Sequence, residues 1–226
     1  MDSINSSDYW NNKWKRYNVN LEKYKKYYFD KQRHKIFSEV LKAIKENLVE
    51  GMKINSFLDA GCGNGEFINS YIININNKDM LVDKPNISGF DHSIDGLTWA
   101  RNVNQYILLE RVDFENKQDV FKIFEQSGIT YDVITCIEVI EHIKEAENLI
   151  SNILHSLKDE NSFAVFSVPK DSYFPAEHIR MFNSELSIIK LFGKLGRIID
   201  IKTIKEKHKR KNSKGYYYNY IVVMKK

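Results

Sequence analysis

The chain has 226 residues, which suits one α/β domain with extensions and leaves too few residues for two ordinary domains. Charged residues make up 28% of the chain and no long uncharged apolar run occurs, so the sequence predicts no transmembrane helix. The net charge of +4 is modest, and by itself it does not indicate a nucleic-acid partner.

The N-terminal residues and the cysteines bear on where the protein resides. The polar, acidic start from Met1 to Asn5 has neither the basic nor the apolar region of a signal peptide, so we expect a cytoplasmic protein. The two cysteines, Cys62 and Cys136, form no Cys-x-x-Cys pair. We expect both to be buried, reduced thiols in adjacent strands.

The first segment, from Tyr9 to about Val49, is predicted to be helical, because its apolar and aromatic residues recur at spacings of three and four. Several aromatic residues stand beside basic ones in this segment. Such a stripe could form a nucleic-acid surface, but packing against the rest of the domain is the more common explanation.

The stretch from Ile54 to Ile68 is the most informative part of the chain. A short apolar strand ends near Leu58 and is followed by Asp59, by three alternating glycines and by a helix-compatible pattern. Glycine tolerates positive φ and lets a ligand approach the backbone, so this strand, turn and helix predict a cofactor cradle. A dinucleotide fingerprint would need the spacing G-x-G-x-x-G, and a carboxylate in the cradle would repel a pyrophosphate.

The run Asp59-Ala60-Gly61-Cys62-Gly63-Asn64-Gly65 resembles motif I, (D/E)-x-G-x-G-x-G, of the class I S-adenosylmethionine-dependent methyltransferases. The resemblance implies a doubly wound, seven-stranded, mostly parallel α/β sheet that ends in an antiparallel hairpin. It also implies that S-adenosylmethionine is bound by Asp59, Gly61, Cys62, Gly63 and Gly65. Relatives carry an N-terminal helical cap with a Tyr-Trp near its start, which makes Tyr9, Trp10 and Trp14 candidates for lining the cofactor site.

The next two strand ends supply further candidates for cofactor binding. A helix from Glu66 to about Ile75 and a polar stretch from Asn76 to Asn86 lead to the strand from Ile87 to Phe90. An acidic residue after this strand can bond both ribose hydroxyls of an adenosine, so we assign Asp91 and its neighbour His92 to the ribose. Capping of the following helix, which begins near Asp95, is compatible with that role.

A third strand is predicted from Tyr106 to Val112, after a helix from about Gly96 to Asn104. It is followed by Asp113 and Phe114. By the resemblance, an acidic residue here accepts a hydrogen bond from the adenine amino group while its neighbour packs on the ring. Asp113 and Phe114 match that arrangement.

The fourth strand, from Tyr131 to Ile137, is almost continuously apolar and β-branched, as a strand buried on both faces should be. Central parallel strands direct their carboxyl ends to the ligand crevice. We therefore place Ile137 and Glu138 against the cofactor and expect the acceptor chemistry just beyond them.

Methyl transfer from a sulfonium needs mainly alignment and a dry pocket, together with a base where the acceptor is a hydroxyl. Histidine titrates near neutral pH, so His142 is the candidate general base, and His178 is a second one. The string Glu138-Val139-Ile140-Glu141-His142 resembles a segment of ubiquinone-biosynthesis-like and other small-molecule O-methyltransferases, in which Glu138 has a structural or substrate-positioning role.

The same string also resembles small-RNA 2′-O-methyltransferases, in which it binds a divalent metal together with a later histidine. Here that set would be Glu138, Glu141, His142 and His178. The RNA enzymes carry paired histidines near the later ligand, and this chain has only His178 there. We therefore assign no metal site.

The remaining predicted elements are a helix from about Glu145 to Leu157, a strand from Phe163 to Val168, a helix from about Ser184 to Leu195 and strands from Arg197 to Ile204 and from Tyr216 to Met224. The basic stretch from Lys202 to Lys214 has seven Lys or Arg residues and one acidic residue, Glu206. It could attract RNA phosphates or an anionic sugar nucleotide, but we favour a solvated hairpin loop.

These observations predict one methyltransferase domain over residues 1–226, with an N-terminal cap over 1–49 and a Rossmann-like core over 50–226. We expect methyl transfer from S-adenosylmethionine to a small-molecule acceptor, at a hydroxyl oxygen of a sugar or other metabolite. The alternatives are a metal-dependent RNA 2′-O-methyltransferase, a non-catalytic cofactor-binding partner subunit and, disfavoured by the glycine spacing, a dehydrogenase. Nothing in the sequence indicates an oligomeric state.

Overall fold

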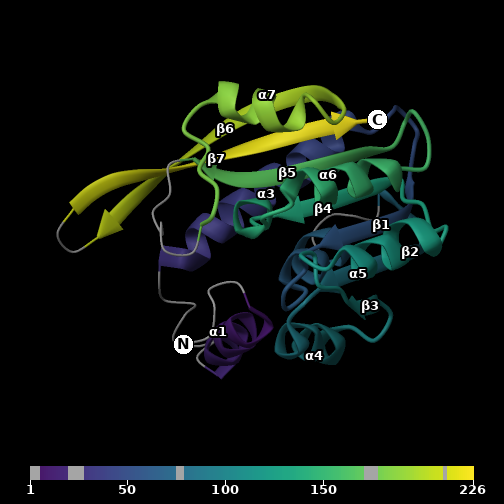
Figure 1. The fold of residues 1–226 in the computed structure, drawn as a ribbon, viewed down its shortest axis with the longest axis horizontal. Coiled ribbons are helices and arrows are strands. Elements are labelled where there is room, and N and C mark those ends of the chain that lie inside the picture. The colour runs from purple at the N-terminus through teal and green to yellow at the C-terminus, as the bar shows by residue number, and fades with distance from the viewer. Residues whose placement is uncertain (1–5, 20–27, 75–78, 171–177, 211–212) are drawn as a thin grey trace.

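The computed structural model describes residues 6–19, 28–74, 79–170, 178–210 and 213–226, and its described strands form one seven-stranded sheet (Figure 1). The strand order is β3-β2-β1-β4-β5-β7-β6. The first five strands are parallel, whereas β7 runs antiparallel to both of its neighbours. The predicted fold class is confirmed. The strands are β1 (Ile54–Ala60), β2 (Leu81–Asp91), β3 (Leu108–Arg111), β4 (Val133–Ile137), β5 (Phe163–Lys170), β6 (Arg197–Arg210) and β7 (Ser213–Lys225).

Helices cover both faces of the sheet, because each face carries its own layer of buried side chains. One layer receives side chains from α3 (Tyr28–Asn47), the π-helical turn η1 (Ile68–Ile73) and α4 (Ile94–Val103). The other receives them from α5 (Lys117–Phe121), η2 (Lys122–Gln126), α6 (Ala146–His155) and α7 (Glu185–Phe192). No helix within the described part of the chain is long and apolar enough to span a bilayer.

The alternation of side chains along the central strands builds these two layers. In β5, Phe163 and Val165 pack with α3, whereas Ala164 and Phe166 face the layer of α6 and α7. A strand buried on both faces needs apolar residues at most positions, which explains the almost continuous apolar runs in β4 and β5. Their carboxyl ends are thereby fixed in the middle of the sheet.

The N-terminal segment is helical where the structure describes it, in α1 (Ser7–Val19) and α3. Residues 20–27 between the two lie outside the described part. Helix α1 is joined to the start of α4: Asn11 Oδ1 accepts a hydrogen bond from Ser93 Oγ at 2.8 Å, and Ser7 Oγ donates to the carbonyl of His92 at 3.3 Å. Helix α1 is thereby held beside the carboxyl ends of β1 and β2.

Two other expectations need correction. Strand β2 begins at Leu81, so residues 81–86 belong to the strand, although their polar side chains suggested a loop. The extra residues of β2 fit beside β1 because the pairing register shifts between Ile54 and Ser56. The basic stretch from Lys202 to Lys214 is not a loop, because β6 continues to Arg210 and β7 begins at Ser213. Backbone pairing with the following tyrosine-rich segment overrides the polar composition there. The helices α5 and η2 were not predicted.

Candidate active site

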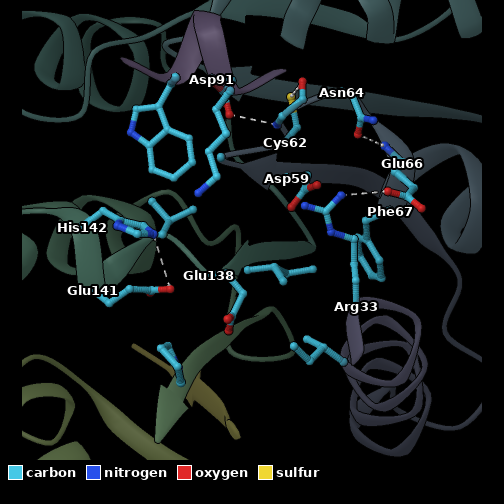
Figure 2. Close-up of a pocket in the computed structure, with 18 of the residues that line it drawn as sticks. Arg33, Asp59, Cys62, Asn64, Glu66, Phe67, Asp91, Glu138, Glu141 and His142 are labelled. Atoms are coloured by element: carbon cyan, nitrogen blue, oxygen red, sulfur yellow. Dashed lines mark hydrogen bonds and ion pairs between the residues drawn. The ribbon is translucent and has the colours of Figure 1, made fainter. Parts of the chain in front are cut away.

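A cavity of about 430 Å³ lies at the carboxyl ends of the central strands, within the size range of small-molecule sites. Figure 2 shows acidic side chains from several strand ends around it, with Arg33 of α3 joined to Glu66. The predicted residues on its wall are Trp10, Trp14, Asp59, Gly61, Cys62, Gly63, Asp91, His92, Phe114, Ile137, Glu138, His142 and His178. Gly65 and Asp113 are not among the residues that line it.

The glycine turn requires its glycines for two different reasons. Gly63 has φ +53°, and a Cβ there would overlap the indole ring of Trp14, so the turn accepts the cap helix only without a side chain. Gly65 has φ +72°, and a Cβ there would press against Ala100 of α4. Gly65 therefore allows close helix packing behind the cavity.

Four backbone N–H groups of this turn already donate to acceptors within the protein. Those of Gly61 and Cys62 both donate to the carbonyl of Phe90, at 2.7 and 2.9 Å, and that of Gly65 donates to the carbonyl of Cys62 at 2.9 Å. The Gly63 N–H donates to Asp91 Oδ2 at 2.8 Å. A pyrophosphate-binding turn needs such donors directed at the ligand. This turn therefore does not suit a dinucleotide.

Asp59 presents a buried carboxyl group at the end of β1. Its side chain is 2% exposed, and Thr135 Oγ1 of β4 donates to its Oδ1 at 2.7 Å. Burial raises the pKa of Asp59 from 3.8 to about 7, and the nearby Asp91 adds to the rise. A cation bound beside Asp59 would favour the charged form.

Asp91, at the end of β2, holds the glycine turn and the following helix together. Its Oδ2 accepts from Gly63, as described, and its Oδ1 accepts from the backbone N–H of Ser93 at 2.8 Å. Burial nevertheless raises its pKa. Ser93 Oγ caps α4 by accepting from Gly96 N at 3.2 Å. Nε2 of the neighbouring His92 is buried and finds no hydrogen-bond partner in the described part of the chain.

Of the two residues predicted to contact the adenine, only one lines the cavity. Phe114 is buried and lies on the cavity wall. Oδ1 of Asp113 accepts from the N–H of Glu115 at 3.0 Å, which closes the loop before α5. The structure therefore brings Phe114, but not Asp113, to the residues that line the cavity.

Glu138 follows β4 in a strained backbone conformation. Its φ of +56° is the only positive value at a non-glycine residue among the described positions. Its Oε1 accepts hydrogen bonds from Ser167 Oγ at 2.7 Å and from Asn219 Nδ2 at 2.8 Å. Burial raises its pKa to about 7, although these two bonds act in the opposite direction. Local strain of this kind commonly accompanies function.

Glu141, His142 and His178 form a compact cluster on the cavity wall, which we call the Glu–His–His cluster. One possible ligand atom of each lies within 4.8 Å of the other two, and the two imidazole ring centroids are 5.0 Å apart. The Glu141 side chain is 1% exposed, yet neither carboxylate oxygen has a hydrogen-bond partner in the described part of the chain. Burial raises its pKa well above the ordinary value, and Glu138 adds to the rise. The ring centroid of Trp10 is 4.9 Å from that of His142.

The sequence did not predict four charged residues of the cavity wall, Lys13, Arg33, Glu66 and Lys170. Nη1 of Arg33 lies 3.0 Å from Glu66 Oε2, and its Cζ lies 5.5 Å from the ring centroid of Trp14. Nζ of Lys13 lies 4.4 Å from the ring centroid of Trp10. Arg33 could have been predicted, because its position continues the buried apolar stripe of α3. A charged residue in such a stripe is uncommon unless it is paired or binds a ligand. Lys13 and Glu66 carry no comparable signal.

Comparisons with known proteins agree with this geometry. The family model described as "Methyltransferase domain" matches residues 28–206. The chain belongs to this methyltransferase family. With this fold and site it is an S-adenosylmethionine-dependent methyltransferase. A search of curated proteins found no match.

Solved structures of methyltransferases resemble this methyltransferase in fold at low sequence identity. An S-adenosylmethionine-dependent methyltransferase from Anabaena variabilis is 15% identical with a TM-score of 0.65, and the alignment covers 100% of this chain and 98% of that one. The N-methyltransferase NodS from Bradyrhizobium japonicum, in complex with S-adenosyl-L-homocysteine, is 12% identical with a TM-score of 0.63 and coverage of 95% and 97%. A putative methyltransferase from Haloferax volcanii, in a complex with the activator Trm112, is 13% identical with a TM-score of 0.65 and coverage of 99% and 96%.

The residues of this methyltransferase fit S-adenosylmethionine chemically. The cofactor's amino acid part bears an ammonium and a carboxylate, and its sulfonium bears a positive charge. The cavity offers the buried carboxyl of Asp59 and the guanidinium of Arg33, while four N–H groups of the turn are already bonded within the protein. A cationic group of the cofactor beside Asp59 would offset the burial that raises the pKa of this carboxyl.

Proposed function

We propose that this methyltransferase transfers the methyl group to a hydroxyl oxygen of a small molecule, such as a sugar or another metabolite, with His142 as general base. S-adenosylmethionine supplies an electrophilic methyl group. The observation that supports the proposal is the position of His142, which is buried on the cavity wall between Trp10 and His178. A hydroxyl must lose its proton during transfer, and an imidazole in a dry site can accept it.

Cofactor binding follows from the distribution of charge in the cavity. In this proposal Asp59 holds the ammonium group and Arg33 holds the carboxylate, each as an opposite charge in a poorly solvated site. Asp91 accepts from the ribose hydroxyls, and Phe114 packs on the adenine. Gly61, Cys62 and Gly63 let the cofactor approach the backbone. We keep Asp113 as a candidate for the adenine amino group, although it bonds within its own loop.

The N-terminal helices act as a cap in this proposal, and residues 1–226 form one domain. Trp10, Lys13 and Trp14 of α1 line the cavity, and Trp14 lies against Gly63. Helix α1 would exclude water from the transferring methyl group, which strengthens electrostatic contacts there. Tyr9 packs edge-on against Trp10, with ring centroids 5.4 Å apart, and supports it from outside the cavity.

The base is tested with His142→Asn, using His155→Asn on the exposed face of α6 as the matched control. We expect His142→Asn to lower kcat by about 100-fold or more and to remove the acidic limb of the kcat/KM pH profile. The affinity for S-adenosylhomocysteine, measured by calorimetry, should change little. An unchanged acidic limb in His142→Asn would exclude this histidine as the base.

A second candidate function is metal-assisted methylation of an RNA 2′-hydroxyl, and the Glu–His–His cluster favours it. A buried carboxylate without a hydrogen-bond partner calls for an explanation, and a bound cation is one. Two imidazoles and a carboxylate suit Mn²⁺ or a similar divalent ion. The sequence grouped Glu138 with these possible metal ligands, but Glu138 is not in the cluster. Its Oε1 accepts hydrogen bonds from Ser167 and Asn219 instead.

Metal binding is tested by titrating the protein with Mn²⁺ in calorimetry and by electron paramagnetic resonance. We expect binding that weakens by about tenfold or more in Glu141→Gln and in His178→Ala, whereas His155→Asn binds like the wild type. Turnover that persists in EDTA, together with no heat of binding and an undiminished six-line spectrum of free Mn²⁺, would leave only the metal-free base mechanism.

A further inference from the structure

Lys170, the last residue of β5, presents its ammonium group at the active-site cavity. The side chain is half-buried, yet within the described part of the chain no carboxylate pairs with its Nζ and no acceptor is bonded to its three N–H donors. Other half-buried lysines are paired, such as Lys35 and Lys202, which both lie 2.7 Å from oxygens of Glu39. The charge of Lys170 is therefore available to a ligand.

The register of three neighbouring strands sets Lys170 beside an aromatic ring. Lys170 pairs with Tyr218 of β7, and Tyr218 pairs with Lys205 of β6, so the three side chains share one face of the sheet. Nζ of Lys170 lies 5.4 Å from the ring centroid of Tyr218, and Nζ of Lys205 lies 5.8 Å from the same centroid. Cation–π contacts of this kind hold an ammonium group in place without neutralising it. Lys170 and Tyr218 line the cavity, whereas Lys205 does not.

The order of the strands divides the cavity into regions, and Figure 1 shows β1, β4, β5 and β7 in succession. Asp59 ends β1, the Glu–His–His cluster follows β4, and Lys170 ends β5. Neighbouring strands are about 4.8 Å apart, so β5 lies about 10 Å from β1. Alternation along β5 places Lys170 on the face of α6 and α7, whereas Arg33 comes from α3 on the other face. Lys170 therefore belongs to the acceptor side of the cavity and not to the cofactor side.

A single small molecule can reach both the candidate base and Lys170. The ring of His178 is 5.0 Å from that of His142, and four residues later Phe182 pairs with Lys170 in an isolated bridge. Four residues of extended chain span at most about 14 Å. The carbonyl of Glu141 fixes this segment beside the cluster, because it accepts from the N–H groups of residues 179 and 180 at 2.9 and 3.2 Å.

We propose that the acceptor is an anionic hydroxyl compound, whose carboxylate or phosphate group binds to Lys170 beside the Tyr218 ring while its hydroxyl lies at His142. The inference rests on the proposed function for the hydroxyl and the base, and it narrows the acceptor to compounds that carry a negative charge. A charge-assisted hydrogen bond is strong in a poorly solvated site. A neutral acceptor would cover the ammonium group of Lys170 without supplying a partner for its charge.

Binding is tested by ligand-observed NMR on the complex with S-adenosylhomocysteine, using pairs of probes that differ in charge. The pairs are para-hydroxybenzoate with para-hydroxybenzamide, glucuronate with glucose, and glycerol phosphate with glycerol. We expect the wild type to bind the anionic member of at least one pair about tenfold or more tightly than its neutral partner. Glucuronate and glycerol phosphate distinguish a carboxylate from a phosphate. A wild type that prefers no anionic probe would overturn the inference.

The test variant is Lys170→Gln, and the matched control is Lys205→Gln, which removes a charge from the same tyrosine ring outside the cavity. Lys170→Gln should bind the preferred anionic probe about tenfold or more weakly and the neutral probe equally well, whereas Lys205→Gln should behave like the wild type. Lys170→Arg restores the charge and should restore most of the preference. Equal affinity for S-adenosylhomocysteine in calorimetry should show that all variants are folded. A preference that persists in Lys170→Gln, or that Lys205→Gln loses to the same extent, would overturn the inference.

Methyl transfer from a radiolabelled cofactor separates failure of this inference from failure of the proposed function. His142→Asn should bind the anionic probes like the wild type while it loses turnover. A charge preference that depends on Lys170, in a protein whose pH profile does not depend on His142, would support the inference and refute the proposed base. A pH profile that depends on His142 with neutral acceptors alone would overturn the inference and leave the proposed function intact.

Discussion

Asp59→Asn should make the cofactor-free methyltransferase more stable at neutral and alkaline pH while weakening cofactor binding. The carboxyl is buried, and its pKa rises from 3.8 to about 7 in the folded protein. The unfolded chain therefore ionises this group first, and the folded protein loses stability between about pH 4 and pH 7. Asparagine stays neutral and can still accept the hydrogen bond from Thr135 Oγ1.

The magnitude follows from the size of the pKa shift. One pKa unit corresponds to about 1.4 kcal/mol, so between pH 5 and pH 8 the wild type loses about 3 kcal/mol that Asp59→Asn retains. Below pH 4 the carboxyl is protonated in both states and the advantage of the variant disappears. Above pH 7 the carboxyl is ionised in both states and the advantage stays constant.

The assay is urea denaturation of both proteins without cofactor at pH 5 and pH 8. The control is Asp83→Asn, the same change at an exposed position of β2. Its free energy of unfolding should equal that of the wild type at both pH values. Calorimetry at pH 8 should show that Asp59→Asn binds S-adenosylmethionine at least about tenfold more weakly. A stability difference that is equal at pH 5 and pH 8 would refute the reasoning.

Three further changes test other parts of the site. Gly63→Ala should lose about 1–2 kcal/mol of stability and most of its cofactor affinity, because φ is positive there and a Cβ would overlap the Trp14 ring. Adding Trp14→Ala should restore part of the lost stability in thermal unfolding, whereas additive effects of the two changes would contradict the contact. Arg33→Lys should bind S-adenosylhomocysteine about tenfold more weakly in calorimetry, since an ammonium neither stacks on Trp14 nor offers a carboxylate the paired donors of a guanidinium. Equal affinity would remove Arg33 from the cofactor site. Asp132→Ala should destabilise the protein by about 3 kcal/mol in urea denaturation, because two N–H groups of β1 lose their acceptor; a loss below about 1 kcal/mol would show that water replaces it.

The sequence predicted the elements that have a strong local signal. The glycine turn after β1 could be predicted because positive φ and close packing leave glycine as the only suitable residue. Strands β4 and β5 could be predicted because burial on both faces makes them almost continuously apolar. The polar start of β2 and the basic ends of β6 and β7 were missed, because backbone pairing with a distant strand holds them and leaves no apolar pattern.

The sequence by itself determined the fold class and the kind of cofactor, since Asp59 and the three glycines form one contiguous local motif. Only the tertiary structure decided which other residues meet that motif. Arg33, Trp14 and the Glu–His–His cluster come from segments far apart in the chain, and no sequence spacing encodes their separation in space.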